Sequence, residues 1–195
     1  MEQHALASHP IRLINNDDLR RSRLTVFFRL LLALPHIIWL GLWGFVVYFV
    51  AALGWLVALF TGRLPDPFHN FIASYTRYFT HAYAYWHLLA DPFPSFSGSA
   101  AYPVDLQIAA PEKQNRLTIF FRILLSIPAF LLAYVFRFLI SILAFVGWFY
   151  ALATGRMSAG IENLGNYALR YESQTIAYSL LLTEKYPSLS GSPAA

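Results

Sequence analysis

Hydrophobic and polar positions along the chain form a pattern that occurs twice. Residues 24–60 and 117–153 are almost continuously apolar. After each of these blocks, apolar residues recur at intervals of three and four over residues 68–90 and 161–183, which is typical of an amphipathic helix. The pattern predicts two tandem repeats, residues 1–99 and 100–195, each with a long apolar element followed by an amphipathic helix.

Short motifs at a constant offset of 93 residues confirm that the two halves are copies. The sequence Arg-Leu-Thr-Val-Phe-Phe-Arg from Arg23 returns as Arg-Leu-Thr-Ile-Phe-Phe-Arg from Arg116, and Thr-Gly-Arg ends both apolar blocks. A glycine at the end of a helix adopts the left-handed conformation, and a basic residue beside it interacts with the last carbonyls. Thr-Gly-Arg therefore predicts a helix C-terminus at Gly62 and Gly155, with Arg63 and Arg156 near carbonyls and lipid phosphates.

The apolar blocks are too long for one straight membrane crossing. A helix over residues 24–60 would be about 55 Å long, whereas the hydrocarbon core is about 30 Å thick. Arg137 also lies near the middle of the second block, and a guanidinium at the bilayer centre costs at least about 2.5 kcal/mol. We expect each block to form a helical hairpin, transmembrane or re-entrant, that turns near residues 41–44 and 134–137 and places Arg137 at its tip.

The segments around the apolar blocks complete the predicted fold. The amphipathic helices, residues 68–90 and 161–183, should lie in the plane of the membrane interface. Short alternating segments at residues 9–14 and 102–108 are typical of strands. They are expected either to pair, with Arg12 near Asp105, or to be extended linkers. The predicted fold class is all-α integral membrane, with a short β-segment opening each repeat.

Composition narrows the class of protein. The chain is 57% hydrophobic and 12% charged, contains no cysteine and carries a net charge of +4. A soluble domain has about 25% charged residues. Basic residues stand singly or in short clusters beside apolar blocks, which favours anionic lipids rather than nucleic acid as partners. Without cysteine the chain has no disulfide or thiolate chemistry.

The candidate contact residues are the basic side chains that flank or interrupt the apolar blocks. They are predicted to contact lipid head groups or a partner, and they are Arg20, Arg21, Arg23, Arg63, Lys113, Arg116, Arg137 and Arg156. His36 is the one histidine within an apolar block and is the candidate for a haem ligand, although the second repeat has no counterpart. No spacing of histidines, carboxylates or serines matches a metal or catalytic motif, so neither is predicted.

Several motifs together resemble a bacterial family of membrane proteins. These are Ala-Leu-Pro-His from Ala33, Trp-Leu-Val-Ala-Leu-Phe-Thr-Gly-Arg from Trp55, and the proline turns at residues 91–96 and 186–188. In this combination the chain resembles two tandem copies of the family called domain of unknown function 4389. The second copy has Ala129 in place of His36. The resemblance implies location in a bacterial cytoplasmic membrane and carries no activity.

These observations lead to one functional hypothesis and its alternatives. We expect a non-catalytic scaffold or accessory subunit of a larger membrane complex, in the inner membrane, with both termini and the linker at residues 97–101 in the cytoplasm. The alternative is a protein that binds a lipid or quinone between the two repeats. Haem binding and lipid modification are further alternatives with less support from the sequence.

Overall fold

The computed structural model describes residues 9–98 and 101–190. The N-terminal tail, Ser99 in the linker and the C-terminal tail lie outside the described residues. The cytoplasmic position expected for them stays a prediction. The elements are β1 (Ile11–Asn15), α1 (Arg23–Phe27), α2 (Arg29–Thr61), α3 (Asp66–Trp86), β2 (Val104–Ile108), α4 (Arg116–Phe120), α5 (Arg122–Thr154) and α6 (Ala159–Ser179). The order strand, short helix, long helix, second helix occurs twice, as the repeated sequence predicts.

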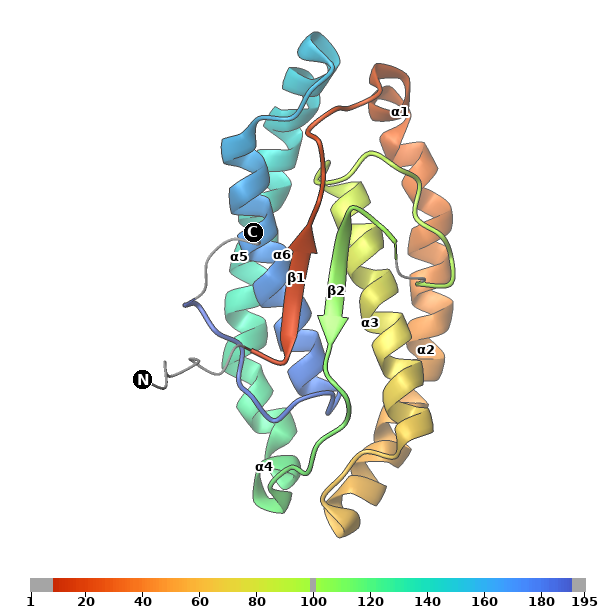
Figure 1. The fold of residues 1–195 in the computed structure, drawn as a ribbon, viewed down its shortest axis with the longest axis vertical. Coiled ribbons are helices and arrows are strands. Elements are labelled where there is room, and N and C mark those ends of the chain that lie inside the picture. The colour runs from red at the N-terminus through yellow and green to blue at the C-terminus, as the bar shows by residue number, and fades with distance from the viewer. Residues whose placement is uncertain (1–8, 99–100, 191–195) are drawn as a thin grey trace, which may run out of the picture.

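The two repeats are arranged with approximate two-fold symmetry (Figure 1). In each repeat the long helix packs against the helix that follows it, α2 against α3 and α5 against α6. The helices α3 and α6 meet in the middle of the molecule, where Thr80 Oγ1 lies 2.9 Å from Ser173 Oγ. Since these residues are 93 positions apart, equivalent residues of the two copies touch each other at the centre of the molecule.

The first segments of each repeat pack on the other repeat. Strand β1 lies on α6 and β2 on α3, while α1 contacts α5 and α4 contacts α2. The indole nitrogen of Trp55 on α2 donates a hydrogen bond of 2.8 Å to the carbonyl of Ile119 on α4, and Trp148 on α5 makes the equivalent bond to Val26 on α1. This exchange of segments makes one intertwined unit out of two copies.

The opening segments form a two-stranded antiparallel ribbon, so the prediction of paired strands is confirmed. Ile11, Leu13, Val104 and Leu106 point into the core. Arg12 lies opposite Gln107, and Asp105 lies opposite Ile14. Arg12 and Asp105 are thus diagonal neighbours on the outer side of the ribbon. The Asp105 carboxylate accepts a hydrogen bond of 2.7 Å from His81 Nε2 and lies 3.4 Å from Arg77 Nε.

The predicted hairpins within residues 24–60 and 117–153 are wrong. Each of α2 and α5 is one continuous helix of 33 residues. Gly44 does not make a turn, because it lies where α3 approaches α2: a Cβ atom there would come within 2.9 Å of the Tyr75 hydroxyl. The chain is interrupted earlier, at Phe28 and Phe121, where the short helices α1 and α4 end. Gly44 therefore provides close helix packing rather than a turn.

The amphipathic helices exist, and they pack mainly against protein, while their position at the membrane interface stays a prediction. In α3 the apolar side, including Ile72 and Phe79, is buried against the protein, and the polar side meets the ribbon through Arg77 and His81. In α6 almost every residue from Gly165 to Tyr178 is buried. Both helices form the inner layer of the molecule, covered by the ribbon on one side and by a long helix on another.

Candidate functional site: a cleft between the long helices

The outer sides of α2 and α5 are apolar and exposed. In the most hydrophobic part of each helix only 17% of the residues are buried, whereas the core helix of a soluble protein is mostly buried. The exposed side chains include Leu30, Ile38, Leu42, Phe45, Phe49 and Phe60 on α2, and Ile123, Leu131, Phe138, Phe145 and Phe149 on α5. By length and composition both helices are able to cross a membrane.

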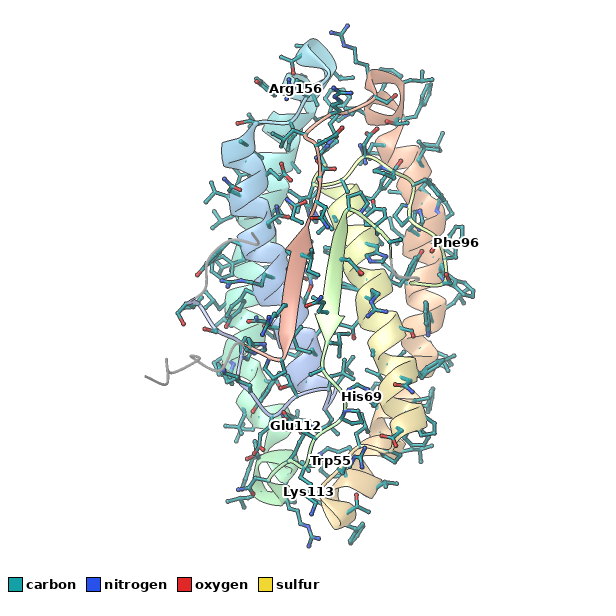
Figure 2. All side chains as sticks on the ribbon, viewed as in Figure 1. Trp55, His69, Phe96, Glu112, Lys113 and Arg156 are labelled. Carbon is teal, nitrogen blue, oxygen red and sulfur yellow. The ribbon has the colours of Figure 1, made fainter. Side chains whose placement is uncertain are left out.

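Except for Arg137, the predicted basic contact residues lie towards the two ends of the elongated molecule, where Figure 2 labels Arg156 and Lys113. At one end Arg20 forms a backbone bridge to Arg156, and Arg23 donates to the carbonyl of Ala153 at the end of α5. At the other end lie Lys113 and Arg116, beside Gly62 and the exposed ion pair of Arg63 with Asp66. All of these except Arg21 and Arg137 are exposed. The contacts proposed for them with lipid head groups stay a prediction.

Arg21 does not fit the predicted role of these residues as contacts of lipid head groups. Its side chain is buried, with Nη1 2.6 Å from Asp17 and Nε donating to the carbonyl of Leu88. A buried, paired guanidinium of this kind is not available to a lipid phosphate. Arg21 therefore joins the start of the chain to the end of α3 and has a structural role.

The Thr-Gly-Arg motif ends each long helix as predicted. Gly62 and Gly155 have φ angles of 74° and 72°, in the left-handed region. Their carbonyls accept backbone hydrogen bonds from Gln114 and Arg21, respectively, in the opposite repeat. The last carbonyls of α5 are approached by Arg23 rather than by Arg156. The motif is thus also a joint between the repeats.

Arg29 and Arg122 are equivalent buried cations at the starts of α2 and α5. Arg29 is 2% exposed; it donates to the carbonyls of Tyr85 and Ala90, pairs with Asp91 at 2.9 Å, and lies over the Tyr85 ring. Arg122 likewise donates to the carbonyls of Tyr178 and Thr183 and lies over the Tyr178 ring, but Gln114 takes the place of the acid. Each arginine holds the C-terminal end of the inner helix. The available sequence signal was the recurrence of an arginine and a tyrosine 56 residues later in both copies.

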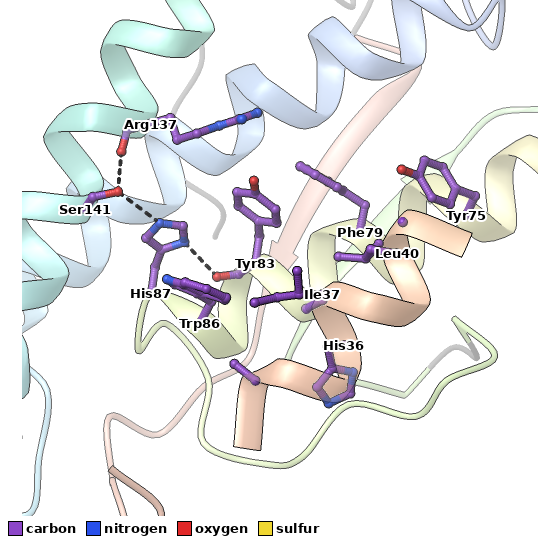
Figure 3. A pocket seen from close by; sticks show the side chains of 13 residues that line it. His36, Ile37, Leu40, Tyr75, Phe79, Tyr83, Trp86, His87, Arg137 and Ser141 are labelled. Atoms are coloured by element: carbon purple, nitrogen blue, oxygen red, sulfur yellow. Dashed lines mark hydrogen bonds between the residues drawn. The ribbon is translucent and has the colours of Figure 1, made fainter. Parts of the chain in front are cut away.

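A cleft of about 440 Å³ lies between α2, α3 and α5 (Figure 3). Its walls are mainly apolar and aromatic, and polar groups gather at the side formed by α5 and the end of α3. The lining residues are Ala33, His36, Ile37, Leu40, Gly41, Tyr75, Phe79, Ala82, Tyr83, Trp86, His87, Arg137 and Ser141. Ligand-binding pockets typically have volumes of about 300–1,000 Å³ with a few placed polar groups, so this cleft is the candidate binding site.

Arg137 lies in the cleft and not at a hairpin tip, so its predicted position is wrong. Its guanidinium pairs with Glu172 on α6 and lies 5.3 Å from the ring centre of Tyr83. The Arg137 side chain is 41% exposed, while that of Glu172 is 4% exposed. The free-energy cost that argued for a hairpin applies to an arginine without an ionic partner. Arg137 has such a partner, Glu172, because α6 folds against α5.

His87, at the end of α3, is the second polar group of the cleft. Its Nδ1 lies 3.0 Å from the carbonyl of Tyr83, and its Nε2 lies 3.5 Å from the Ser141 hydroxyl. Burial lowers the pKa of His87 to about 4, so the ring is neutral at pH 7. A carbonyl only accepts hydrogen bonds, so the proton is on Nδ1, and Nε2 presents a lone pair.

His36, the candidate haem ligand, is enclosed by aromatic rings. Its Nδ1 lies 2.6 Å from the Tyr78 hydroxyl, and the rings of Phe93 and Phe96 have centres at 4.4 and 4.9 Å. Its Nε2 is fully buried. An iron atom would have to displace the atoms that cover this nitrogen. Among the described residues there is also no group of three histidine, cysteine or acidic side chains that would hold a metal ion.

Comparison with known proteins places the chain by family alone. No curated protein and no solved structure matches it. One family matches twice, over residues 23–98 and 116–190, which correspond to the two repeats. The chain is therefore a tandem duplication, and it belongs to the family described as Domain of unknown function (DUF4389).

Proposed function

We propose that the protein is a non-catalytic membrane scaffold or accessory subunit that lies along one surface of the bilayer. The observation that carries the proposal is the uneven distribution of apolar and charged groups. The outer sides of α2 and α5 expose large apolar residues over their whole length. The ribbon carries exposed Arg12 and Gln107. If the apolar sides of the long helices are buried in lipid and the ribbon stays in water, the apolar and the polar surfaces each have a suitable solvent.

The length of the long helices favours this orientation. A helix of 33 residues is about 50 Å long, well beyond the hydrocarbon thickness of about 30 Å. Apolar side chains are exposed from Leu30 to Phe60, so an upright helix would leave several of them in water. With the long axis in the membrane plane, the whole apolar side contacts acyl chains.

The position of the ribbon supports the same orientation. The ribbon lies midway between the two ends of the molecule and parallel to the long helices (Figure 1). In an upright molecule the polar outer side of the ribbon would lie near the bilayer centre, where polar groups are costly. In the flat orientation Arg12 is in water, and the basic residues at both ends, such as Arg20 and Lys113, reach anionic head groups on one surface.

The sidedness of the two ends tests the orientation. Single cysteines that replace Arg20, Lys113 and Gln107 in this cysteine-free chain should react with a membrane-impermeant maleimide from one side of the membrane. All three should therefore be labelled in the same preparation, either inverted or right-side-out vesicles. A cysteine at Val46, on the apolar side of α2, should react only after the membrane is dissolved. Labelling of positions 20 and 113 from opposite sides would show that the molecule stands upright.

Photo-crosslinking tests the scaffold role. A photoreactive amino acid at Gln107, on the water-facing ribbon, should form a crosslink to one protein of defined mass in native membranes. The same group at Phe45 on α2 should crosslink mainly to lipid. If position 107 gives no defined protein product in cells that express the chain at its natural level, the scaffold proposal is wrong.

A further inference from the structure

The cleft continues into a second hollow that gives it the shape of an amphiphile site. This hollow, about 280 Å³, shares Trp86, His87 and Ser141 with the cleft and extends between Leu30 of α2 and Phe145 of α5. Its lining is mostly apolar. A ring-shaped head group in the first space can thus be followed by a hydrocarbon tail in the second.

The charges of the cleft favour a neutral ligand. Arg137 is the one cation in its lining, and the carboxylate of Glu172 pairs with it. The pair has no net charge, so it offers little Coulombic attraction for a phosphate. The exposed part of the guanidinium still presents N–H donors. An uncharged oxygen atom that accepts from Arg137 suits this site better than an anion.

The Nε2 atom of His87 can accept a hydrogen bond from a ligand. The Ser141 hydroxyl has one proton, which it donates to the carbonyl of Arg137 at 2.8 Å. It has no second proton for His87 Nε2, and the distance of 3.5 Å agrees with a weak contact. Nε2 is therefore an acceptor at the edge of the cleft that lacks a strong donor (Figure 3). A ligand hydroxyl would supply one.

The aromatic walls select a flat ring. Phe79 and Tyr83 stack with ring centres 4.1 Å apart, and Trp86 stands beside His87 in the cleft. We propose that this site binds a prenylated quinol, whose ring lies among these aromatic groups, with one hydroxyl donating to His87 and one oxygen accepting from Arg137. The isoprenoid tail follows the second hollow toward Phe145. The quinone form has two carbonyls and cannot donate to His87, so the reduced form binds more tightly.

The duplication provides an internal comparison. The positions equivalent to Arg137, Ser141 and His87 in the opposite half are Gly44, Tyr48 and Leu180. None of these offers the same donor and acceptor. One ligand per chain is therefore expected, although the fold has two-fold symmetry.

Binding is measured by isothermal titration calorimetry, without oxygen, on the full chain in dodecyl maltoside. The probes are ubiquinol-1 and ubiquinone-1, which carry a single isoprene unit. Ubiquinol-1 should bind with a stoichiometry of one and about tenfold more tightly than ubiquinone-1, because the oxidised form leaves a buried acceptor unpaired. His87→Leu, which introduces the residue found at position 180, should remove this preference.

A second variant tests the site without altering its polar groups. A Cβ atom at Gly41 meets no atom within 4 Å and would point into open space, so Gly41→Leu fills the cleft. The variant should raise the melting temperature, since leucine favours a helix more than glycine does, and should weaken ubiquinol-1 binding at least tenfold. Tyr134→Leu, at the equivalent exposed position of α5, is the matched control and should leave binding unchanged.

Four results would overturn the proposal. One is the absence of saturable binding by either probe. The second is equal affinity of the two redox forms, and the third is unaltered binding by Gly41→Leu. The fourth is competition in which phosphatidylglycerol displaces ubiquinol-1 stoichiometrically, which would identify the occupant as an anionic phospholipid. None of these results depends on the orientation or the partner proposed above, so the two proposals fail or succeed separately.

Discussion

The ion pair between Arg137 and Glu172 allows a quantitative test of the fold. Replacing Arg137 by leucine leaves the Glu172 carboxylate, whose side chain is 4% exposed, without its cation. Loss of one partner from a fully buried pair costs about 3–5 kcal/mol. Because the Arg137 side chain is 41% exposed and its charge is partly screened, we expect the free energy of unfolding to fall by about 2–3 kcal/mol.

The loss should depend on pH. Burial raises the pKa of Glu172 above its ordinary value, and the Arg137 charge opposes that rise. Without Arg137 the pKa rises further. A carboxyl group with a raised pKa in the folded state binds its proton more tightly there than in the unfolded state, so its contribution to stability is present at low pH and is lost as pH increases through the folded pKa. The deficit of Arg137→Leu should therefore shrink when pH is lowered from 8 toward 5.

The assay measures unfolding in mild detergent at pH values between 5 and 8, with tryptophan fluorescence as the signal. Glu172→Gln removes the carboxylate with little change of shape, so the double variant Arg137→Leu, Glu172→Gln should recover most of the stability at pH 8. The reasoning would be refuted if Arg137→Leu were as stable as the natural sequence at every pH. Equal stability would mean that the pair does not form.

Three further stability predictions concern contacts and the C-terminal end of α2. Arg29→Met should lower the free energy of unfolding by about 3 kcal/mol in the same assay, because it removes the hydrogen bonds to the carbonyls of Tyr85 and Ala90 and the cation that pairs with Asp91; Leu30→Met, next to it and exposed, is the control and should have no measurable effect. Gly62→Ala should cost about 1–2 kcal/mol, since φ is 74° there, and a smaller loss than at exposed Gly160→Ala would contradict this. Trp55→Phe should cost about 1 kcal/mol by removing the bond to Ile119, and unchanged thermal unfolding would show that this bond adds nothing.

The sequence by itself determined the repeat, the amphipathic helices and the glycine at which each long helix ends. The offset of 93 residues, the apolar blocks and the Thr-Gly-Arg motif depend on local properties: period, hydrophobicity and the conformational freedom of Gly62 and Gly155. Local properties also predicted the short strands. Each of these features can be recognised without knowing which segments meet in space.

Only the tertiary structure decided how the segments are paired. The position of Arg137 within an apolar block indicated a hairpin only as long as no acid was known to pair with it. Glu172 becomes that partner because α6 folds back along α5. Arg29 is buried because the chain at the end of α3 provides carbonyls that accept its hydrogen bonds. The free-energy cost of a charge depends on the groups that surround it, and the contact of Arg137 with Glu172, 35 positions later, leaves no periodic signal in the sequence. The cleft, which needs three helices at once, has the same origin.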